Sequence, residues 1–225
     1  MDNVNEWSLE FDLLYQNITS NQAPGLTEYE KSVFLTRAQE AVVVMLYNGT
    51  LKDSFEETEE ITDYLDTLVK TVHLTVPEDS MTTPRIISTS EIFALPDDLL
   101  FRTLELCTLD VEGCGEMEAS VVPVTQDEFW RTRRNPFKGP NKSRVLRLAF
   151  AVSDEQRYSE LVSKYDITSY TVRYLARPEP IILTDLVDGL SINGESNEKT
   201  CKLPKALHQT ILVEAVKAAK AVWAS

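Results

Sequence analysis

Three cysteines and two histidines are the residues of this chain best suited to metal or nucleophilic chemistry, so their spacing decides which reactions are plausible. Cys107, Cys114 and Cys201 lie far apart, and no two cysteines have the Cys-x-x-Cys spacing of a structural zinc site. The only possible nitrogen ligands are His73 and His208, and neither is close to a cysteine pair. We therefore expect reduced thiols, no metal site and no cofactor.

Other catalytic patterns are also missing from the sequence. There is no Gly-x-Ser-x-Gly motif, and the seven glycines form no glycine-rich loop before a helix, since Gly113-Cys114-Gly115 stands alone in an acidic turn. The spacing of the 36 acidic residues selects no pair as general acid and general base. We expect His73 to lie in a strand and His208 to lie at the surface or cap a helix. The chain is therefore predicted not to be an enzyme.

The most unusual local composition is a basic segment, residues 131–147, which contains seven bases and no acid. Its central Asn-Pro-Phe-Lys-Gly-Pro motif has two prolines, which stiffen the backbone. We predict a subunit or partner interface that uses this segment and two arginines farther along the chain: Arg131, Arg133, Arg134, Asn135, Pro136, Phe137, Lys138, Lys142, Arg144, Arg173 and Arg177.

Three interpretations of the basic segment remain open at this point. Bases beside an aromatic residue can follow a phosphate backbone, although the chain has no RNP, zinc-finger or helix-turn-helix pattern. The bases can also belong to a solvated loop that merely offsets nearby acids. The third interpretation is a loop that docks on an acidic protein neighbour, and the prolines favour it because a rigid loop loses less entropy on docking.

Composition and charge exclude several classes of protein. The 225 residues are 43% hydrophobic, which is ordinary for a globular protein, and no apolar run approaches the roughly 18 residues of a membrane span. Residues 1–130 contain 26 acids and 6 bases, whereas residues 131–225 contain 10 acids and 16 bases. Opposite charges in the two parts favour a molecule that stacks head to tail or binds one acidic and one basic partner. Acidic helix faces that are merely solvated would also explain the excess of acids in residues 1–130. Because no leader pattern follows Met1, we expect the chain to stay in the cytosol where it is made.

The N-terminal third has the periodicity of helices. A first helix is expected from a stripe of Trp7, Phe11, Leu14 and Ile18. A second should begin at the capping box Thr27–Glu30 and end at Asn48-Gly49. Its expected buried face is Val33 or Phe34, Ala38, Ala41, Val42, Met45 and Leu46. A third helix is expected at about 56–69.

From Thr71 onward the pattern changes to short β-like runs, with helices at two places. Strands or short extended runs are expected at 72–76, 92–95, 99–109, 121–124, 145–152, 170–175 and 181–183. A short helix at 127–134 should be capped by Thr125, and 186–198 should form a turn-rich hairpin. A closing helix from Pro204 has the apolar face Leu207, Ile211, Ala215, Ala218, Ala219 and Val222.

These elements predict an α+β fold. We expect an N-terminal helical bundle, residues 1–70, that is closed by the C-terminal helix, 204–225. We expect the inserted β-rich region to be an antiparallel sheet over 71–203, with a basic loop at 131–144.

Several blocks of the sequence resemble the ring or neck structural proteins of crAss-like tailed phages. The blocks are Leu14 to Leu26 running into Glu28 to Thr36, Asn135-Pro136-Phe137-Lys138-Gly139-Pro140, Val172 to Pro178, Pro180 to Leu183, and the closing helix at Leu207-His208. The acidic stretch 53–80 and the Gly113-Cys114-Gly115 turn match no part of that pattern.

The resemblance implies a virion structural protein that forms a head-tail connector, a neck ring between portal and tail around the DNA channel. It further implies a dodecameric homo-oligomer that contacts the portal protein and adjacent ring or tail proteins, in the virion and, during assembly, in the host cytoplasm. Genomic DNA is expected to pass through without specific binding, and no membrane is involved. The alternative from another class is a phage DNA-binding or regulatory protein that uses 131–147.

Overall fold

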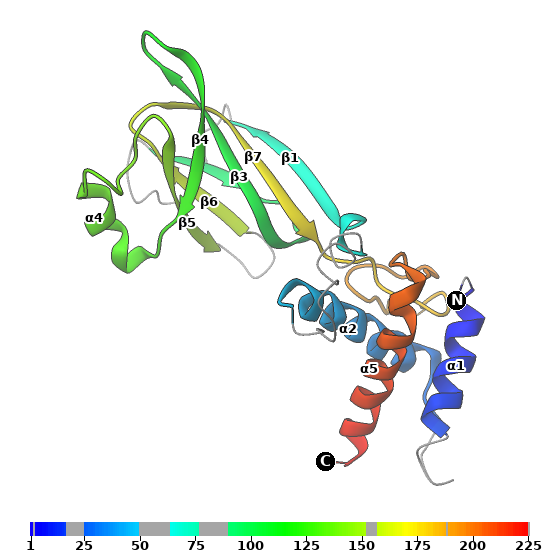
Figure 1. Cartoon of the computed structure of the whole chain (residues 1–225). Helices are drawn as coiled ribbons and strands as arrows, with labels where there is room; N and C mark the ends of the chain where they lie inside the picture. The colour runs from blue at the N-terminus through cyan, green and yellow to red at the C-terminus, as the bar shows by residue number, and fades with distance from the viewer. Residues whose placement is uncertain are drawn as a thin grey trace. The chain divides into compact units, whose positions relative to one another are not determined.

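A computed structural model of the chain shows an α+β protein with two compact units (Figure 1). It describes residues 1, 3–16, 25–49, 64–76, 90–151, 157–187 and 189–224. One unit comprises Met1–Leu68 with Arg177–Ser225, and the other comprises Val69–Ala176. Residues 177–203, which we expected in the β-rich region, therefore group with the helices.

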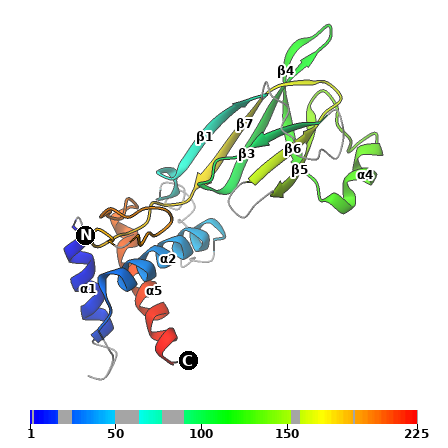
Figure 2. The same cartoon turned by 180° about the vertical axis from the view of Figure 1, so that it is seen from behind.

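The first unit contains the helices α1 (Val4–Gln16), α2 (Glu28–Tyr47) and α5 (Lys205–Ala224). Helix α5 packs against both α2 and α1, as Figure 2 shows from behind. Helix α1 buries Val4, Trp7, Phe11 and Tyr15, which recur at three and four residue steps. The stripe was predicted correctly at Trp7 and Phe11 but wrongly at Leu14, which is only half-buried because it lies about 100° around the helix from Tyr15. Ile18 lies outside the described residues.

Helix α2 begins at the predicted capping box. The Thr27 hydroxyl accepts a hydrogen bond from the Glu30 amide at 3.3 Å, and the Thr27 amide donates to the Glu30 carboxylate at 2.8 Å. Asn48 caps the C-terminus, and Gly49 follows with a φ of 65°, a conformation that a residue with a side chain rarely adopts. Both predicted ends of this helix are confirmed.

Replacing Thr27 with Ala should destabilise the first unit by about 1 kcal/mol, because both hydrogen bonds of the Thr27 hydroxyl, with the Glu30 amide and with the Glu30 carboxylate, are lost. Thr125 is the matched control, since it occupies the N-cap of the helix at 126–134 but its side chain makes no capping hydrogen bond. The Thr27 hydrogen bonds lower the pKa of Glu30 from its usual 4.5, so their stabilisation is present above that pH and is lost as the pH falls through the lowered value. Denaturant unfolding at pH 7 and pH 3 measures both effects. If substitution by Ala lowered the free energy of unfolding equally at Thr27 and at Thr125, Thr27 would not be a stabilising cap. If the difference between the two variants were the same at pH 7 and pH 3, the Glu30 carboxylate would not contribute to the cap.

The buried face of α2 is more polar than the hydrophobic pattern indicated. Ala38, Val42 and Leu46 are buried as predicted, whereas Val33, Phe34, Ala41 and Met45 are half-buried. Lys31, Ser32, Thr36 and Gln39 are also buried and were missed, because hydrophobic periodicity does not select polar residues. The apolar Leu35 and Val43 are buried too, beside the predicted stripe rather than on it.

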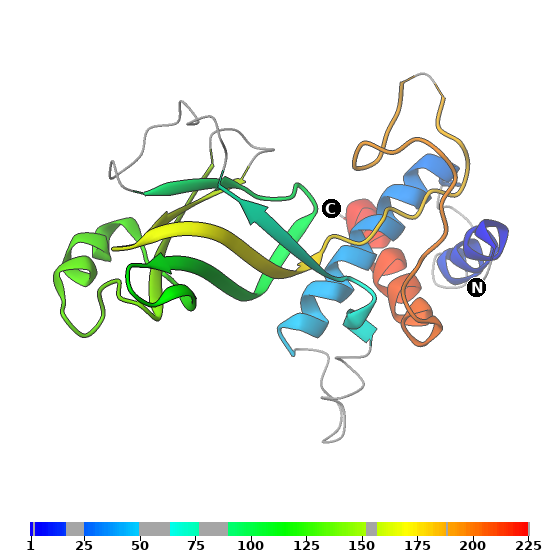
Figure 3. The same cartoon turned by 90° about the horizontal axis from the view of Figure 1, so that it is seen from above.

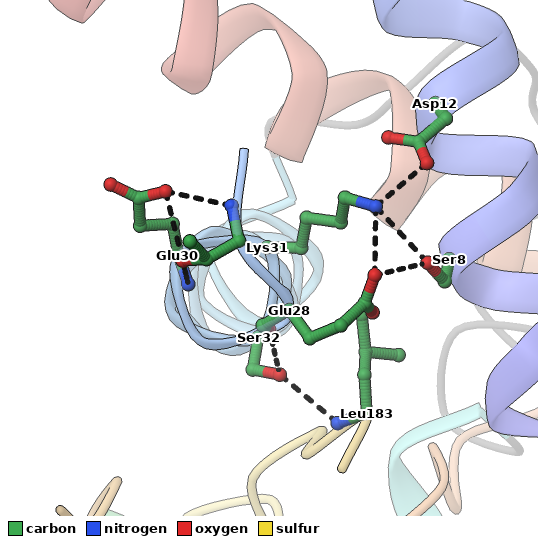
Figure 4. Close-up of polar contacts among 8 residues, drawn as sticks. Ser8, Asp12, Glu28, Glu30, Lys31, Ser32 and Leu183 are labelled. Atoms are coloured by element: carbon green, nitrogen blue, oxygen red, sulfur yellow. Dashed lines mark hydrogen bonds and ion pairs between the residues drawn. The ribbon is translucent and has the colours of Figure 1, made fainter. Parts of the chain in front are cut away.

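Lys31 joins α2 to α1 (Figure 4). Its ammonium lies 2.7 Å from the Asp12 carboxylate and 2.9 Å from that of Glu28, and it also donates to the Ser8 hydroxyl at 3.1 Å. The side chain is 4% exposed. Burial acts to lower the pKa of Lys31, but the hydrogen bonds from its ammonium to Asp12 and Glu28 outweigh burial and raise it. Lys31 is therefore charged at neutral pH and anchors α1 to the start of α2.

Two hydroxyls of α2 hold the extended segment that follows the sheet. Ser32 accepts a hydrogen bond from the Leu183 amide at 3.0 Å, and Thr36 accepts one from the Ile181 amide at 3.1 Å. The segment then pairs with itself through the bridge Ile182–Lys199. It turns at Asn193 and Gly194, whose φ angles of 52° and 82° fit a turn within the hairpin predicted at 186–198. Asp188, which we also placed in a turn, lies outside the described residues.

The face of α5 was predicted in part. Leu207, Ile211, Ala215 and Ala219 are buried, but Ala218 is exposed and Val222 is 62% exposed, so both predictions were wrong. His208 is also buried, against the prediction of a surface or capping position. Its ring packs against that of Trp7, with the centroids 4.9 Å apart and the planes tilted by 49°, and its Nε2 hydrogen-bonds to the Leu203 carbonyl at 3.0 Å. His208 shares the buried face of this helix with Ile211 and Leu212, three and four positions farther along.

The third expected helix falls mostly outside the described residues, since 56–63 are not described. Residues 64–66 are helical and Leu65 is buried. Val69 was wrongly placed in this helix, because it begins strand β1.

The second unit is a seven-stranded sheet in the order β1-β7-β3-β4-β5-β6-β2 (Figure 3). The strands are β1 (Val69–Thr75), β2 (Glu91–Ala94), β3 (Leu99–Val111), β4 (Gly115–Pro123), β5 (Arg144–Ala151), β6 (Arg157–Val162) and β7 (Asp166–Ala176). The strands expected at 72–76, 99–109, 121–124, 145–152 and 170–175 are confirmed within the described residues, whereas β6 was not foreseen. The sheet is not wholly antiparallel as predicted, because β4 and β5 run parallel. The helix α4 (Gln126–Arg134) lies between them in the chain. A short hairpin would make the two strands antiparallel, whereas a longer connection through a helix lets them run parallel.

The sheet curls, so that strands far apart in its order meet across the core. Phe93 of β2 contacts Tyr170 of β7 with ring centroids 5.3 Å apart, and Arg157 of β6 donates to the Leu99 carbonyl of β3 at 2.9 Å. The core inside the curl consists of Phe93, Leu95, Leu99, Cys107, Leu109, Val111, Ala119, Val145, Leu161, Tyr170, Val172, Tyr174 and Ala176.

Candidate interaction surface

The predicted basic loop begins with α4, which is fixed to one face of the sheet by a single aromatic residue. Phe129 is 1% exposed and packs against Leu146, Leu148 and Val162. Helix α4 itself is short and strongly polar, and Phe129 is its only buried residue. The rest of the helix, with its three arginines, therefore remains on the outside of the unit.

The loop that follows α4 is braced by its own hydrogen bonds. The Asn135 side-chain oxygen accepts from the amides of Phe137 at 2.9 Å and Lys138 at 3.3 Å, and the Gly139 amide donates to the Asn135 carbonyl at 2.8 Å. Arg144 donates to the Phe137 carbonyl at 2.6 Å. A Cβ on Gly139 would lie 2.8 Å from two backbone oxygens, so only glycine fits there. The loop thus has a defined conformation before any partner binds.

Two aromatic side chains are exposed on this braced loop. Phe137 is 86% exposed and Trp130 is 49% exposed. The guanidinium of Arg133 lies over the Trp130 ring at 5.5 Å. Together with their neighbours they line a shallow, open depression of about 720 Å³, which we call the basic-aromatic depression: Trp130, Arg131, Arg134, Asn135, Pro136 and Phe137.

The cations of the loop are mostly uncompensated. Arg131 makes one exposed contact with Glu128 at 3.5 Å. Arg134 and Lys138 are exposed, and within the described part of the chain neither is in an ion pair. The Lys142 ammonium lies 3.5 Å from the Cys114 sulfur. An exposed positive surface with few internal anions attracts negative groups from outside.

The structure does not bring all of the predicted interface residues together. Arg173 is exposed in β7, the second strand of the sheet order, which neighbours neither β4 nor β5, the strands that flank the loop in the chain. Arg177 belongs to the first unit, where its guanidinium lies 3.6 Å from the Glu40 carboxylate. The sequence reasoning also missed Trp130, although an aromatic residue between arginine-rich positions is a signal of a binding surface.

A buried ionic cluster lies inside the sheet and could not be recognised from the sequence. Glu105 and Arg147 are each 9% exposed, with the Arg147 Nε 3.0 Å from a Glu105 carboxylate oxygen. Arg102 lies 3.5 Å from the same oxygen, and the Tyr170 hydroxyl donates a hydrogen bond to it. Burial, together with the charge of Arg147, lowers the pKa of Arg102, and burial and the charge of Glu105 raise the pKa of Tyr170. Arg147, the last base of the basic segment, therefore belongs to the core and not to the surface.

The thiols do not form a reactive centre in the described structure. Burial raises the pKa of Cys107 to about 12 and that of Cys201 to about 11, so both remain protonated at neutral pH. Cys114 is exposed at the turn between β3 and β4. Among the described residues, no three side chains of His, Cys, Asp or Glu gather in a way that could hold a metal ion. Within the same residues, no helix has the length and apolar character needed to cross a membrane.

Comparison with known proteins agrees with the resemblance seen in the sequence. The family model described as phage tail ring protein 3/4 matches residues 1–224. "Ring protein 3" of Bacteroides phage crAss001 is 42% identical over 220 residues, covering 95% of this chain and 93% of the relative. "Ring protein 4/5" of the same phage is 34% identical over 233 residues, covering 98% and 93%. Because the match extends over both units, the chain belongs to the phage tail ring protein 3/4 family.

Proposed function

We propose that this protein is a virion structural protein that forms a homo-oligomeric ring in the neck of a tailed phage. In this role it is a head-tail connector, an adaptor between portal and tail, and its ring of twelve copies surrounds the DNA channel. The family membership of almost the whole chain supports a ring-forming structural role rather than a catalytic one. Assembly would take place in the host cytoplasm, and the contacts with the portal protein and with adjacent ring or tail proteins are part of the proposal.

The braced loop with its basic-aromatic depression is the observation that carries the proposed assembly. A cyclic ring with head-to-tail contacts needs two unlike, complementary surfaces on every subunit. Arginine and exposed aromatic residues are enriched at the centres of protein interfaces. A loop held by Asn135, Gly139 and Arg144 also loses little entropy on docking. We therefore assign this loop to the subunit interface or to the contact with an adjacent neck protein.

We infer that DNA passes the ring without specific binding. The net charge of the chain is −14, which on the whole repels phosphates. Each phosphate bound by Lys or Arg would release counterions and would have to be freed again as the DNA moves, which would slow ejection. A channel wall without tight phosphate contacts avoids this cost.

We also infer that α1, α2 and α5 form one bundle that folds together, with the N-terminal region, 1–70, joined by 204–225. The buried ammonium of Lys31 between α1 and α2 and the packing of α5 on both helices support this arrangement. The basic loop then belongs to a second folding unit.

Reversing the charge of Arg131, Arg133, Arg134 and Lys138 to Glu should abolish ring formation, or incorporation into virions, without changing the melting temperature. The loop is attached through Phe129 and its backbone, not through these side chains, so folding should persist. The matched control reverses four exposed lysines elsewhere, Lys70, Lys164, Lys202 and Lys217, and should assemble normally. Negative-stain imaging and circular dichroism are the measurements. Normal particles from the loop variant would refute the interface.

Titration of the wild-type protein and the loop variant with duplex DNA distinguishes the proposed ring protein from a DNA-binding or regulatory protein. At about 0.15 M salt the wild-type protein should bind DNA no better than an unrelated acidic protein. Submicromolar affinity that falls steeply with salt and depends on 131–147 would instead favour a DNA-binding or regulatory protein.

A further inference from the structure

An acidic hairpin, the β3–β4 turn with its flanking residues, belongs to the same unit that carries the basic-aromatic depression. Strands β3 and β4 are joined by a tight turn in which the Cys114 amide donates to the Val111 carbonyl at 2.8 Å. Gly113 and Gly115 have φ angles of 80° and 72°, and a Cβ at either position would meet no atom within 4 Å. The backbone at these two glycines therefore has open space beside it.

The charge of this hairpin is entirely negative. Asp110, Glu112, Glu116 and Glu118 are all exposed, and residues 103–130 contain no Lys, Arg or His. Glu116 lies opposite Asp110 in the strand register, so like charges face each other across the hairpin. Such pairs are destabilising in an isolated hairpin, and a cationic partner would relieve the repulsion.

The basic-aromatic depression has the complementary character. Arg134 and Lys138 are exposed without an ion pair in the described residues, and Phe137 is held outward by the hydrogen bonds to its neighbours. Within one molecule, the basic segment touches the hairpin tip through Lys142, whose ammonium lies 3.5 Å from the Cys114 sulfur. In the described structure the hairpin acids form no ion pair with Arg131, Arg134 or Lys138 of their own chain.

We propose that the acidic β3–β4 hairpin of one copy seats in the basic-aromatic depression of the next copy. This inference rests on the proposed ring, and it names the partner of the loop as a second copy of this chain. The two surfaces are unlike and both belong to the second unit, so the contact is directional and can repeat around a closed ring. Opposite charges steer the encounter, while Trp130 and Phe137 supply the apolar contact that charge alone lacks.

The test combines charge reversal with cross-linking of the full chain. The hairpin variant carries Glu112→Lys and Glu116→Lys, the loop variant carries Arg131→Glu and Arg134→Glu, and a third variant carries all four changes. Glu10→Lys with Asp97→Lys, two exposed acids elsewhere, is the matched control for the hairpin variant. Sedimentation velocity over a wide concentration range reports association. A carbodiimide, which joins carboxylates to lysines directly, is applied to a mixture of unlabelled and ¹⁵N-labelled protein.

The expected result is a set of mixed-isotope cross-links between the hairpin acids, Glu112 or Glu116, and Lys138 in wild-type protein. Each two-residue variant should associate at least about tenfold more weakly, the four-residue variant should recover most of the association, and the control should behave as wild type. If the wild type forms rings but the hairpin variant assembles equally well and no mixed cross-link appears, this contact is wrong and the proposed ring stands. If the wild type stays monomeric at every concentration and gives no mixed cross-link, the ring-forming function itself fails.

Discussion

Replacing Ile211 with Asp is expected to unfold the first unit. Ile211 is fully buried on α5, the helix that packs against both α1 and α2. Truncating a buried Ile typically costs about 2–5 kcal/mol, and an unpaired carboxylate in the same place adds a desolvation cost. The total is comparable with the roughly 5–15 kcal/mol that stabilises a typical domain. Circular dichroism melting and limited proteolysis should therefore show aggregated or protease-sensitive protein.

Val222 provides the matched control on the same helix. It is 62% exposed, so Val222→Asp introduces the same charge without burying it and should change stability by less than about 0.5 kcal/mol. Limited proteolysis of the wild-type monomer gives a second check. If a protease removes α5 rapidly and the remainder melts at the original temperature, α5 is a docking arm and the proposed bundle is wrong.

Replacing Glu105 with Ala is expected to destabilise the second unit by about 3–5 kcal/mol, because it leaves buried cations without their anion. Arg147 and Arg102 both approach the same Glu105 oxygen, and the Tyr170 hydroxyl donates to it. With the carboxylate gone, the two guanidinium groups repel each other in a poorly solvated place. Chemical denaturation should show a lower midpoint for the sheet unit.

Glu118→Ala is the control for this effect, since Glu118 is an exposed acid on the neighbouring strand β4 and should cost little. Glu105→Gln separates the contribution of the charge from that of side-chain shape and hydrogen bonding, because Gln keeps the shape and a hydrogen-bond acceptor but removes the charge. If Glu105→Ala melts like wild type, water must solvate the two arginines, and the cluster is not a buried ionic centre.

The sequence predicted those features that depend on neighbouring residues. The capping box at Thr27 and the turn at Asn193-Gly194, within the hairpin expected at 186–198, each need only a few adjacent residues, and both are confirmed. Helices and strands with a clear apolar stripe were also found, because such a stripe identifies the element that must bury it. The stiff basic loop could also be recognised, because proline and glycine restrict or free the backbone at their own positions.

What depends on distant residues was missed or misplaced. The sequence grouped Arg147 with the basic segment 131–147, but in the fold its side chain pairs with Glu105, 42 positions away, and lies in the core. Lys31 and His208 were likewise not recognised as buried, because burial of a polar side chain depends on partners supplied by other helices.

The sequence by itself determined the α+β composition, the main helices, most strands and the resemblance to phage ring proteins. Only the tertiary structure decided that 177–203 join the helices, that β4 and β5 run parallel, and that the acidic hairpin and the basic loop belong to one unit. The physical reason is that hydrogen bonding within a helix and the preferences of turns are local, whereas strand order, register and the pairing of buried charges are decided by contacts between residues far apart in the chain.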